Sequence, residues 1–414
     1  MSFSSQGFAP EVVKALTECG YQKLTPIQQK AIPLARKGHD ILANAQTGTG
    51  KTAAFALPVI QQLLDSKKTA TRRSARALIL APTRELAEQI AVNIADYTKY
   101  TSLSVTAVFG GKKMSSQERA LDPGVDILVA TPGRLQEHIE EGNISIANLE
   151  FLVFDEADRM LDMGFIHDIR KILSYLPRQR QNLLFSATFS NDIRKLAKTM
   201  VNDPIEISVT PRNTTADTVK QWIVPVDKKQ KPELLAALVH KHNWDQVLVF
   251  SRTKHGADRL VKQLDKNQIT AVAIHGNKSQ NARTRALASF KKSGVRVLVA
   301  TDIAARGIDI NQLPQVVNFD LPNVPEDYVH RIGRTGRAGE VGQAVSLVSA
   351  DEIKQLRDIE RLIGRALERR LEDGFEPDHD LPASNSNVGV KKSNKPKMGG
   401  YKHTSNKGGN NSGN

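Results

Sequence analysis

Short apolar runs alternate with helical patterns along most of the chain. The runs are four to six residues long, rich in Val, Ile and Leu, and do not alternate with polar residues. Strands that are buried on both faces of a parallel sheet have this character. The runs are ALIL (77–80), ILVA (127–130), FLVF (151–154), VLVF (247–250), VRVLVA (295–300) and QVVNF (315–319). Together they predict an α/β fold in which helices flank mostly parallel sheets.

The pattern occurs twice, which predicts two similar domains. The stretch ILVATPGR (127–134) resembles VLVATDIAARG (297–307), and a polar, turn-rich segment lies between them. Two such domains form a cleft, and their sheets bind ligands at the carboxyl ends of the strands. The expected divisions are an N-terminal domain over 1–208, a linker over 209–217, a C-terminal domain over 218–370 and a basic, low-complexity tail over 371–414.

The composition of the chain indicates the cellular compartment in which the protein folds. The chain has 414 residues and one cysteine, Cys19, which excludes an intramolecular disulfide and a cysteine-based zinc cluster and fits a reducing environment. No run approaches the roughly 18 apolar residues of a membrane span. The start, MSFSSQGFAP, lacks the basic cap and apolar stretch of a secretory signal. We therefore expect a cytoplasmic protein without membrane attachment.

Charge indicates the class of partner. The net charge is +14, and the segment from Asn385 contributes six lysines and no acidic residue, so the rest of the chain carries +8 (14 − 6). A basic protein gains affinity for phosphate backbones by releasing counterions, although a basic soluble enzyme would have the same charge. The polar composition from about residue 385 predicts disorder there.

The segment AQTGTGKT (45–52) has the pattern of a phosphate-binding loop. It follows the short run ILAN and precedes a helical pattern, and the usual first glycine is replaced by Ala45. In such loops backbone N–H groups face the phosphates and the following helix adds its dipole. We expect Lys51 to reach the terminal phosphates and Thr52 to bind Mg²⁺. The full set of expected nucleotide contacts in the loop is Ala45, Gln46, Thr47, Gly48, Thr49, Gly50, Lys51 and Thr52.

Carboxylates follow another strand end. Asp155 and Glu156 come directly after the apolar run FLVF. In phosphate-loop enzymes a second strand end supplies a carboxylate to the same Mg²⁺, which we expect to be Asp155. Glu156 is then the candidate to orient or deprotonate the attacking water.

The sequence DEAD (155–158) resembles the signature of the DEAD-box RNA helicases, and the resemblance extends over nearly all of residues 1–370. The segment GYQKLTPIQ (20–28) is similar to the Q motif of that family. The resemblance implies that Gln28 hydrogen-bonds the adenine edge, that Tyr21 stacks on its ring, and that Phe3 supplies the family's isolated upstream aromatic, which makes the site selective for ATP.

Further motifs resemble the family's RNA contacts. In the first half these motifs are PTREL (82–86), the glycine pair at 110–111 and TPGR (131–134). In the second half they are QNAR (280–283) and TDIAARGID (301–309). Arginines, hydroxyls and glycine N–H groups at strand ends suit phosphates and do not read bases. The implied RNA contacts are Arg84, Gly110, Gly111, Thr131, Arg134, Arg283 and Thr301.

The remaining motifs of the family concern catalysis and coupling. The segment HRIGRTGR (330–337) resembles the helicase motif whose arginines reach across the cleft, here Arg334 and Arg337; the planar guanidinium can pair with two phosphate oxygens. Asp309 is implied as a contact to the ATP ribose. The residues implied in coupling between the domains are Asp158, Ser186, Thr188 and His330.

The resemblance implies a fold of two RecA-like domains and an ATP-dependent RNA helicase that uses ATP and Mg²⁺, separates short duplexes locally and has little sequence preference. Ribonucleoprotein or RNA-decay partners are family roles, and we expect a monomer most similar to bacterial RhlE-type members. Two alternatives stay open on sequence alone. One is an ATP-gated RNA clamp or annealing chaperone, and the other is a DNA helicase of the same superfamily.

Overall fold

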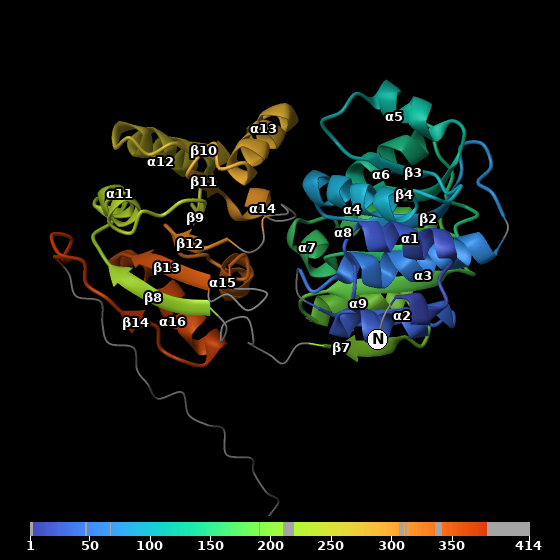
Figure 1. Ribbon diagram of the computed structural model, residues 1–414, viewed down its shortest axis with the longest axis horizontal. Helices are drawn as coiled ribbons and strands as arrows, with labels where there is room; N and C mark the ends of the chain where they lie inside the picture. The colour runs from blue at the N-terminus through green and yellow to red at the C-terminus, as the bar shows by residue number, and fades with distance from the viewer. Residues whose placement is uncertain are drawn as a thin grey trace, which may run out of the picture.

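The computed structural model describes residues 3–45, 48–66, 68–189, 191–209, 219–305, 310, 313–335 and 342–378. They form two halves that lie side by side, and each half is built on a seven-stranded parallel sheet (Figure 1). The expected linker lies outside the described residues from position 210, and the expected tail lies outside them from position 379.

The first half is a sheet in the order β3-β4-β2-β5-β6-β1-β7 with helices on both faces. Its strands are β1 (Ile41–Asn44), β2 (Ala75–Leu80), β3 (Val105–Val108), β4 (Val125–Ala130), β5 (Phe151–Phe154), β6 (Gln181–Ser186) and β7 (Ile205–Ser208). Its α-helices are α1 (Pro10–Glu18), α2 (Pro26–Arg36), α3 (Lys51–Asp65), α4 (Arg84–Tyr97), α5 (Met114–Leu121), α6 (Pro132–Glu140), α7 (Ala157–Asp162), α8 (Ile166–Ser174) and α9 (Asn191–Met200).

The second half has the order β10-β11-β9-β12-β13-β8-β14. Its strands are β8 (Val219–Pro225), β9 (Val247–Phe250), β10 (Ala271–Ile274), β11 (Val297–Ala300), β12 (Gln315–Asn318), β13 (Gly342–Val348) and β14 (Glu368–Arg369). Its α-helices are α11 (Lys231–Lys241), α12 (Lys254–Lys266), α13 (Gln280–Lys291), α14 (Asp302–Ala305), α15 (Pro325–Ile332) and α16 (Ile353–Ile363).

The two sheets repeat one topology. Strand for strand, β1 of the first sheet corresponds to β8 of the second, and β5 corresponds to β12. The segments after the corresponding strands differ, because β1 leads into the glycine-rich loop whereas β8 is followed by Val226 and Asp227 and then by α11. The second half therefore repeats the fold but not the phosphate loop.

Alternating strand residues pack into separate cores on the two faces of each sheet. In β1, for example, Ile41 and Ala43 pack in one core and Leu42 in the other. Strands that are apolar on both faces need helices on both sides, since either face would otherwise meet water.

The predicted fold class is confirmed. All six apolar runs overlap a strand of a parallel sheet, and the runs at 151–154 and 247–250 coincide with β5 and β9. Among the residues that the structure describes, no helix combines the length and the apolar character that a membrane crossing requires.

Candidate active site and nucleic-acid interface

The glycine-rich loop joins a central strand to a buried helix. Strand β1 ends at Asn44 and α3 begins at Lys51. Gly48 and Gly50 have φ values of 77° and 89°, a left-handed conformation that glycine adopts readily. The first N–H groups of α3 have no partner inside the helix, so this turn is suited to bind an anion. Gln46 and Thr47 lie outside the described residues, and Thr49 lies within the turn.

Lys51 and Asp155 form a buried ion pair at the ends of α3 and β5. Lysine Nζ lies 3.4 Å from carboxylate Oδ1, and the side chains are 5% and 3% exposed. Neither atom makes a hydrogen bond to any residue within the described part of the chain. A buried ammonium and a buried carboxylate with unused hydrogen-bonding capacity fit phosphate oxygens and a divalent cation. Thr52, half-buried in the first turn of α3, adds a hydroxyl next to Lys51.

Glu156 has a strained backbone at the start of α7. Its φ and ψ are 54° and 53°, a left-handed conformation that costs a non-glycine residue about 1–2 kcal/mol. The side chain is buried. Such strain persists where the surrounding structure fixes the residue, and it is common at functional sites.

The pKa values of the two adjacent carboxyl groups shift in opposite directions. Burial raises the pKa of Asp155 above its ordinary value despite the nearby Lys51. Burial would also raise the pKa of Glu156, but the positive charges of Lys51, Arg159 and Arg334 outweigh burial and lower it. For Lys51, burial acts to lower the pKa, and the carboxylates of Asp155 and Glu156 outweigh it and raise the pKa. Glu156 is thus held ionised, the state in which it can accept a proton, and Arg334 of the second half contributes to that state.

The expected adenine contact lies against the phosphate loop. Gln28 Oε1 accepts from the N–H of Thr25 at 2.9 Å, and Nε2 donates to the carbonyl of Gly50 at 3.1 Å. Thr25 and Gln28 also form the capping box of α2. A primary amide has two donor hydrogens and two acceptor lone pairs, so one of each is left for an adenine edge.

The two expected aromatic contacts, Phe3 and Tyr21, form a cluster with Tyr97. The Tyr21 hydroxyl lies 2.7 Å from that of Tyr97, the last residue of α4. Phe3, which is 3% exposed, packs edge-to-face on Tyr21 with ring centroids 5.6 Å apart. Phe3 therefore packs against Tyr21, and its own contact with ATP stays a prediction.

Asp158 bonds within the first half. Its Oδ2 accepts from the N–H and the hydroxyl of Thr188 at 3.0 and 3.2 Å. Ser186, which is fully buried, donates to the carbonyl of Thr188 at 2.7 Å. The family resemblance implies that Asp158 takes part in coupling with Ser186, Thr188 or His330. In the structure Asp158 bonds to Thr188 of the segment SAT (186–188), and the hydrogen bonds described for Asp158 do not include His330.

Arg159, which directly follows the DEAD segment and was not among the expected site residues, contacts the second half. Its NH1 lies 3.6 Å from Oδ1 of Asp327, and its NH2 lies 3.5 Å from Nδ1 of His330. Both partners are on α15. The only sequence signal was an additional charge directly after DEAD.

The implied RNA contacts of the first half gather at the ends of β2, β3 and β4. Arg84 begins α4, and its guanidinium packs against Gly110 and Gly111, where an added Cβ would collide with it. Thr131 precedes α6 in an extended conformation. Arg134 donates to the carbonyl of Lys112 at 3.1 Å. The structure thus brings these residues to one edge of the sheet.

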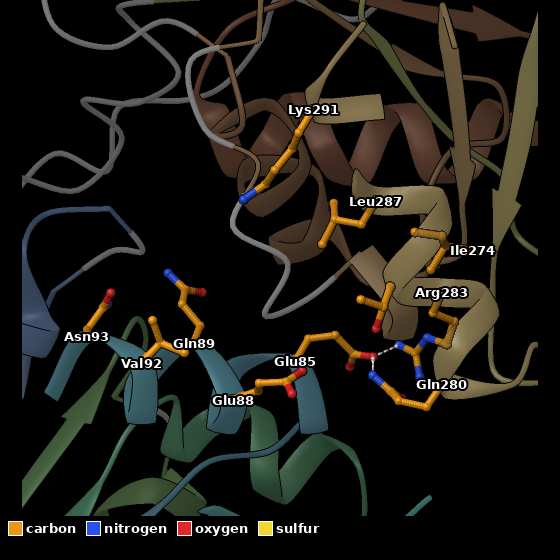
Figure 2. A pocket seen from close by; sticks show the side chains of 11 residues that line it. Glu85, Glu88, Gln89, Val92, Asn93, Ile274, Gln280, Arg283, Leu287 and Lys291 are labelled. Atoms are coloured by element: carbon orange, nitrogen blue, oxygen red, sulfur yellow. Dashed lines mark hydrogen bonds and ion pairs between the residues drawn. The ribbon is translucent and has the colours of Figure 1, made fainter. Parts of the chain in front are cut away.

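The implied RNA contacts of the second half differ in accessibility. Thr301 is buried after β11, and its carbonyl accepts from the N–H groups of Ala304 and Ala305 in α14. Arg283 is held by Glu85 of the first half, with NH2 2.9 Å from Oε1 (Figure 2). Its contact with RNA stays a prediction, because this arrangement occupies its guanidinium with a carboxylate.

Figure 2 shows how Glu85 joins the halves. The same oxygen, Oε1, accepts from Nε2 of Gln280 at 2.9 Å. A cavity of about 290 Å³ lies beside these contacts, between side chains of α4 and α13. Glu85 belongs to the PTREL motif, but nothing in the sequence around it predicts its contact with α13. The expected contacts Asp309 and Arg337 lie outside the described residues.

Comparison with known proteins agrees with this geometry. The family model "DEAD/DEAH box helicase" matches residues 25–196, and "Helicase conserved C-terminal domain" matches residues 230–339. The chain is 44% identical over 370 residues to the ATP-dependent RNA helicase RhlB of Pseudomonas aeruginosa, covering 88% of this chain and 93% of that protein. It is 42% identical over 368 residues to the DEAD-box ATP-dependent RNA helicase CshA of Geobacillus kaustophilus, covering 89% and 78%.

Solved structures share the fold. S. cerevisiae Dbp5 bound to RNA and ADP BeF3 superposes with a TM-score of 0.79 at 30% identity, covering 90% of this chain and 96% of that one. A DEAD box protein from Methanococcus jannaschii gives 0.52 at 38% identity, covering 89% and 99%. The relatives named RhlB and CshA give no support to the expected RhlE-type membership. They do establish the family, and the chain belongs to the DEAD-box ATP-dependent RNA helicases.

Proposed function

We propose that this chain hydrolyses ATP in the cleft between its two halves and that ATP binding closes the halves on RNA. The observation that carries the proposal is the pairing of a buried Lys51–Asp155–Glu156 cluster in the first half with Arg334 of the second half, whose charge reaches Glu156. The likeness to a relative solved with RNA and ADP BeF3 supports it.

In this proposal ATP is the substrate. Thr52 and Asp155 would hold Mg²⁺, which neutralises phosphate charge when bound with ATP. The Glu156 carboxylate orients a water molecule and accepts its proton as the water oxygen attacks the γ-phosphorus. The bond from that phosphorus to the bridging oxygen breaks, which leaves ADP and inorganic phosphate. Lys51 and Arg334 balance the negative charge of the phosphates in the transition state.

RNA would lie across both halves on the face that carries the strand-end loops of Arg84, Thr131 and Thr301. Hydroxyls, guanidinium groups and N–H groups there suit backbone phosphates, so little sequence preference is expected. Contacts to 2′-hydroxyls would favour RNA over DNA. Each ligand completes a site formed by both halves, so each strengthens binding of the other. We infer a monomer acting in the cytoplasm on RNA or ribonucleoprotein substrates, and light scattering on the purified chain tests the monomer.

ATPase and unwinding assays test the function. We expect RNA to stimulate ATP hydrolysis and ATP to drive separation of a short RNA duplex. Glu156→Gln should abolish hydrolysis while ATP binding persists, since the amide keeps the shape but cannot take a proton. Equal unwinding of a matched all-DNA duplex would contradict RNA preference. Full remodelling activity by Glu156→Gln would favour the clamp alternative.

A further inference from the structure

Arg159 is a buried cation at the boundary between the halves. Its side chain is 6% exposed, and NH1 lies 3.6 Å from Oδ1 of Asp327, whose side chain is 13% exposed. Within its own half NH1 lies 3.7 Å from Oδ2 of Asp162, a side chain that is 62% exposed. Its Nε and NH1 make no hydrogen bond to any residue in the described part of the chain. Arg159 is therefore held by charge, and of the two carboxylates in contact with it, Asp327 of the second half is the buried one.

Each end of this contact is fixed to a functional element. Arg159 follows Glu156 by three residues on the short helix α7. Asp327 lies in the first turn of α15, and the chain continues from that helix to Arg334. A change in the distance between Arg159 and Asp327 therefore changes the distance between Arg334 and Glu156.

Helix α15 is anchored to the core of its own half. Arg331 on this helix donates to both carboxylate oxygens of Asp302, at 2.6 and 2.7 Å. It also donates to Oδ1 of Asn318 in β12 at 3.1 Å, and its side chain is 1% exposed. A buried bidentate pair with a further hydrogen bond leaves the helix little freedom.

Closing the halves removes water from Arg159. A buried charge without a nearby opposite charge is strongly unfavourable, and removal of one partner of a buried pair exposes that cost. The Asp327 carboxylate places an opposite charge in contact with Arg159 only when α15 is in place. The pair therefore favours the closed arrangement over the open one.

We propose that Arg159 and Asp327 form an interdomain latch that positions Arg334 against Glu156 and so sets the coupling between ATP and RNA binding. The latch rests on the proposed function, because it needs a cleft that closes on both ligands. Arg159 and Asp327 act as positioning residues, through α7 and α15.

The test measures coupling in the full chain. The coupling factor is the Kd for a single-stranded RNA without nucleotide divided by the Kd with ADP·BeF3. Arg159→Met and Asp327→Asn should each lower this factor by about tenfold or more, within the range typical of coupled sites. The double variant should lose no more than either single variant, because both remove one interaction. Affinity for ADP·BeF3 without RNA should stay within about twofold, since neither residue belongs to the nucleotide contacts.

Two further variants separate a latch from a general structural role. Arg159→Lys should keep the coupling factor within about threefold, because contacts of 3.5–3.7 Å require the charge and not the guanidinium fork. Asp162→Asn is the matched control, since it also faces Arg159 but lies in the same half, and it should leave coupling unchanged.

The latch would be overturned if the losses in coupling factor of Arg159→Met and Asp327→Asn added up in the double variant. It would also be overturned if Asp162→Asn lowered the coupling factor as much as either variant. Thermal melting shows whether Arg159→Met is folded. If it is not, the single and double variants can be measured again with Arg159→Gln in its place. Absence of coupling in the unmodified chain would overturn the proposed function and the latch with it. If the unmodified chain shows coupling but the effects of the two single variants are additive, the latch is overturned and the proposed function stands.

Discussion

Replacement of Gly50 by alanine should impair ATP use through two separate effects. Gly50 has φ of 89°, and a Cβ at this position would lie 2.5 Å from Nε2 of Gln28 and 3.0 Å from the hydroxyl of Thr25. Gln28 is itself buried and hydrogen-bonded to the carbonyl of Gly50. The new methyl group therefore strains the turn and displaces the expected adenine contact.

The size of the effect can be worked from these contacts. The left-handed conformation costs a non-glycine residue about 1–2 kcal/mol. Displacing Gln28 removes its hydrogen bonds to Thr25 and Gly50, each worth about 1 kcal/mol. Without ATP the loop can relax, whereas ATP binding requires the native turn, so we expect the loss to appear in ATP use. A total of about 3–4 kcal/mol corresponds to a fall in kcat/KM of about 140-fold to 700-fold.

The assay is kcat/KM for ATP at saturating RNA, together with the preference for ATP over GTP, which should weaken as Gln28 moves. The matched control is Gly38→Ala. Gly38 has φ of 84°, and a Cβ there would meet nothing within 4 Å, so it incurs the backbone strain alone. It should lower Tm slightly and leave ATP kinetics unchanged. A Gly50→Ala chain with kcat/KM within about threefold of the unmodified value would show that neither effect operates.

Three other predictions concern stability, coupling and the tail. Burial lowers the pKa of His138; the folded state then binds a proton less readily than the unfolded state, so the free energy of unfolding should fall as pH drops below about 6.5. Denaturant melts from pH 8 to 5 should show a shallower dependence in His138→Gln, and an unchanged slope would contradict this. Asp158→Asn weakens the hydrogen bonds to Thr188 and should reduce duplex unwinding more than ATP hydrolysis; equal losses would argue against a coupling role. Deletion of 382–414 removes six lysines and should weaken RNA binding and lower its log–log salt slope by about 0.7 for each phosphate that the tail neutralises. An identical slope would exclude an electrostatic role for the tail.

The edge strands of the two sheets show less of the apolar pattern that marks the six predicted runs. The six predicted runs belong to β2, β4, β5, β9, β11 and β12, which lie inside the sheets and are fully buried. The edge strands β3 and β10 are partly exposed and have the sequences VTAV and AVAI, and β14 has two residues. An edge strand has one neighbour and a half-covered face, so its sequence carries less of the apolar pattern.

Some residues of the site could be placed from the sequence, and others could not. Residues at the carboxyl ends of parallel strands, such as Lys51 and Asp155, could be placed together from sequence because those ends meet at one edge of the sheet. The ion pair of Glu85 with Arg283 could not, since it joins the two halves and depends on how they sit together. Arg159 was overlooked for the same reason, because a charged residue on a helix is most often solvated.

The run FLVFDEAD shows why both halves are needed for one site. Strand β5 aims the carboxylates, but the charges that keep Glu156 ionised come from several elements. Lys51 and Arg159 belong to the first half, whereas Arg334 and His330 belong to the second. The two largest of these contributions, Lys51 and Arg159, belong to the first half, so the first half alone already favours the carboxylate form of Glu156. The second half adds Arg334, which follows α15 along the chain. In the proposed mechanism, closing the cleft therefore brings Arg334 to the same cluster of charges that binds the phosphates, and this ties hydrolysis to closure.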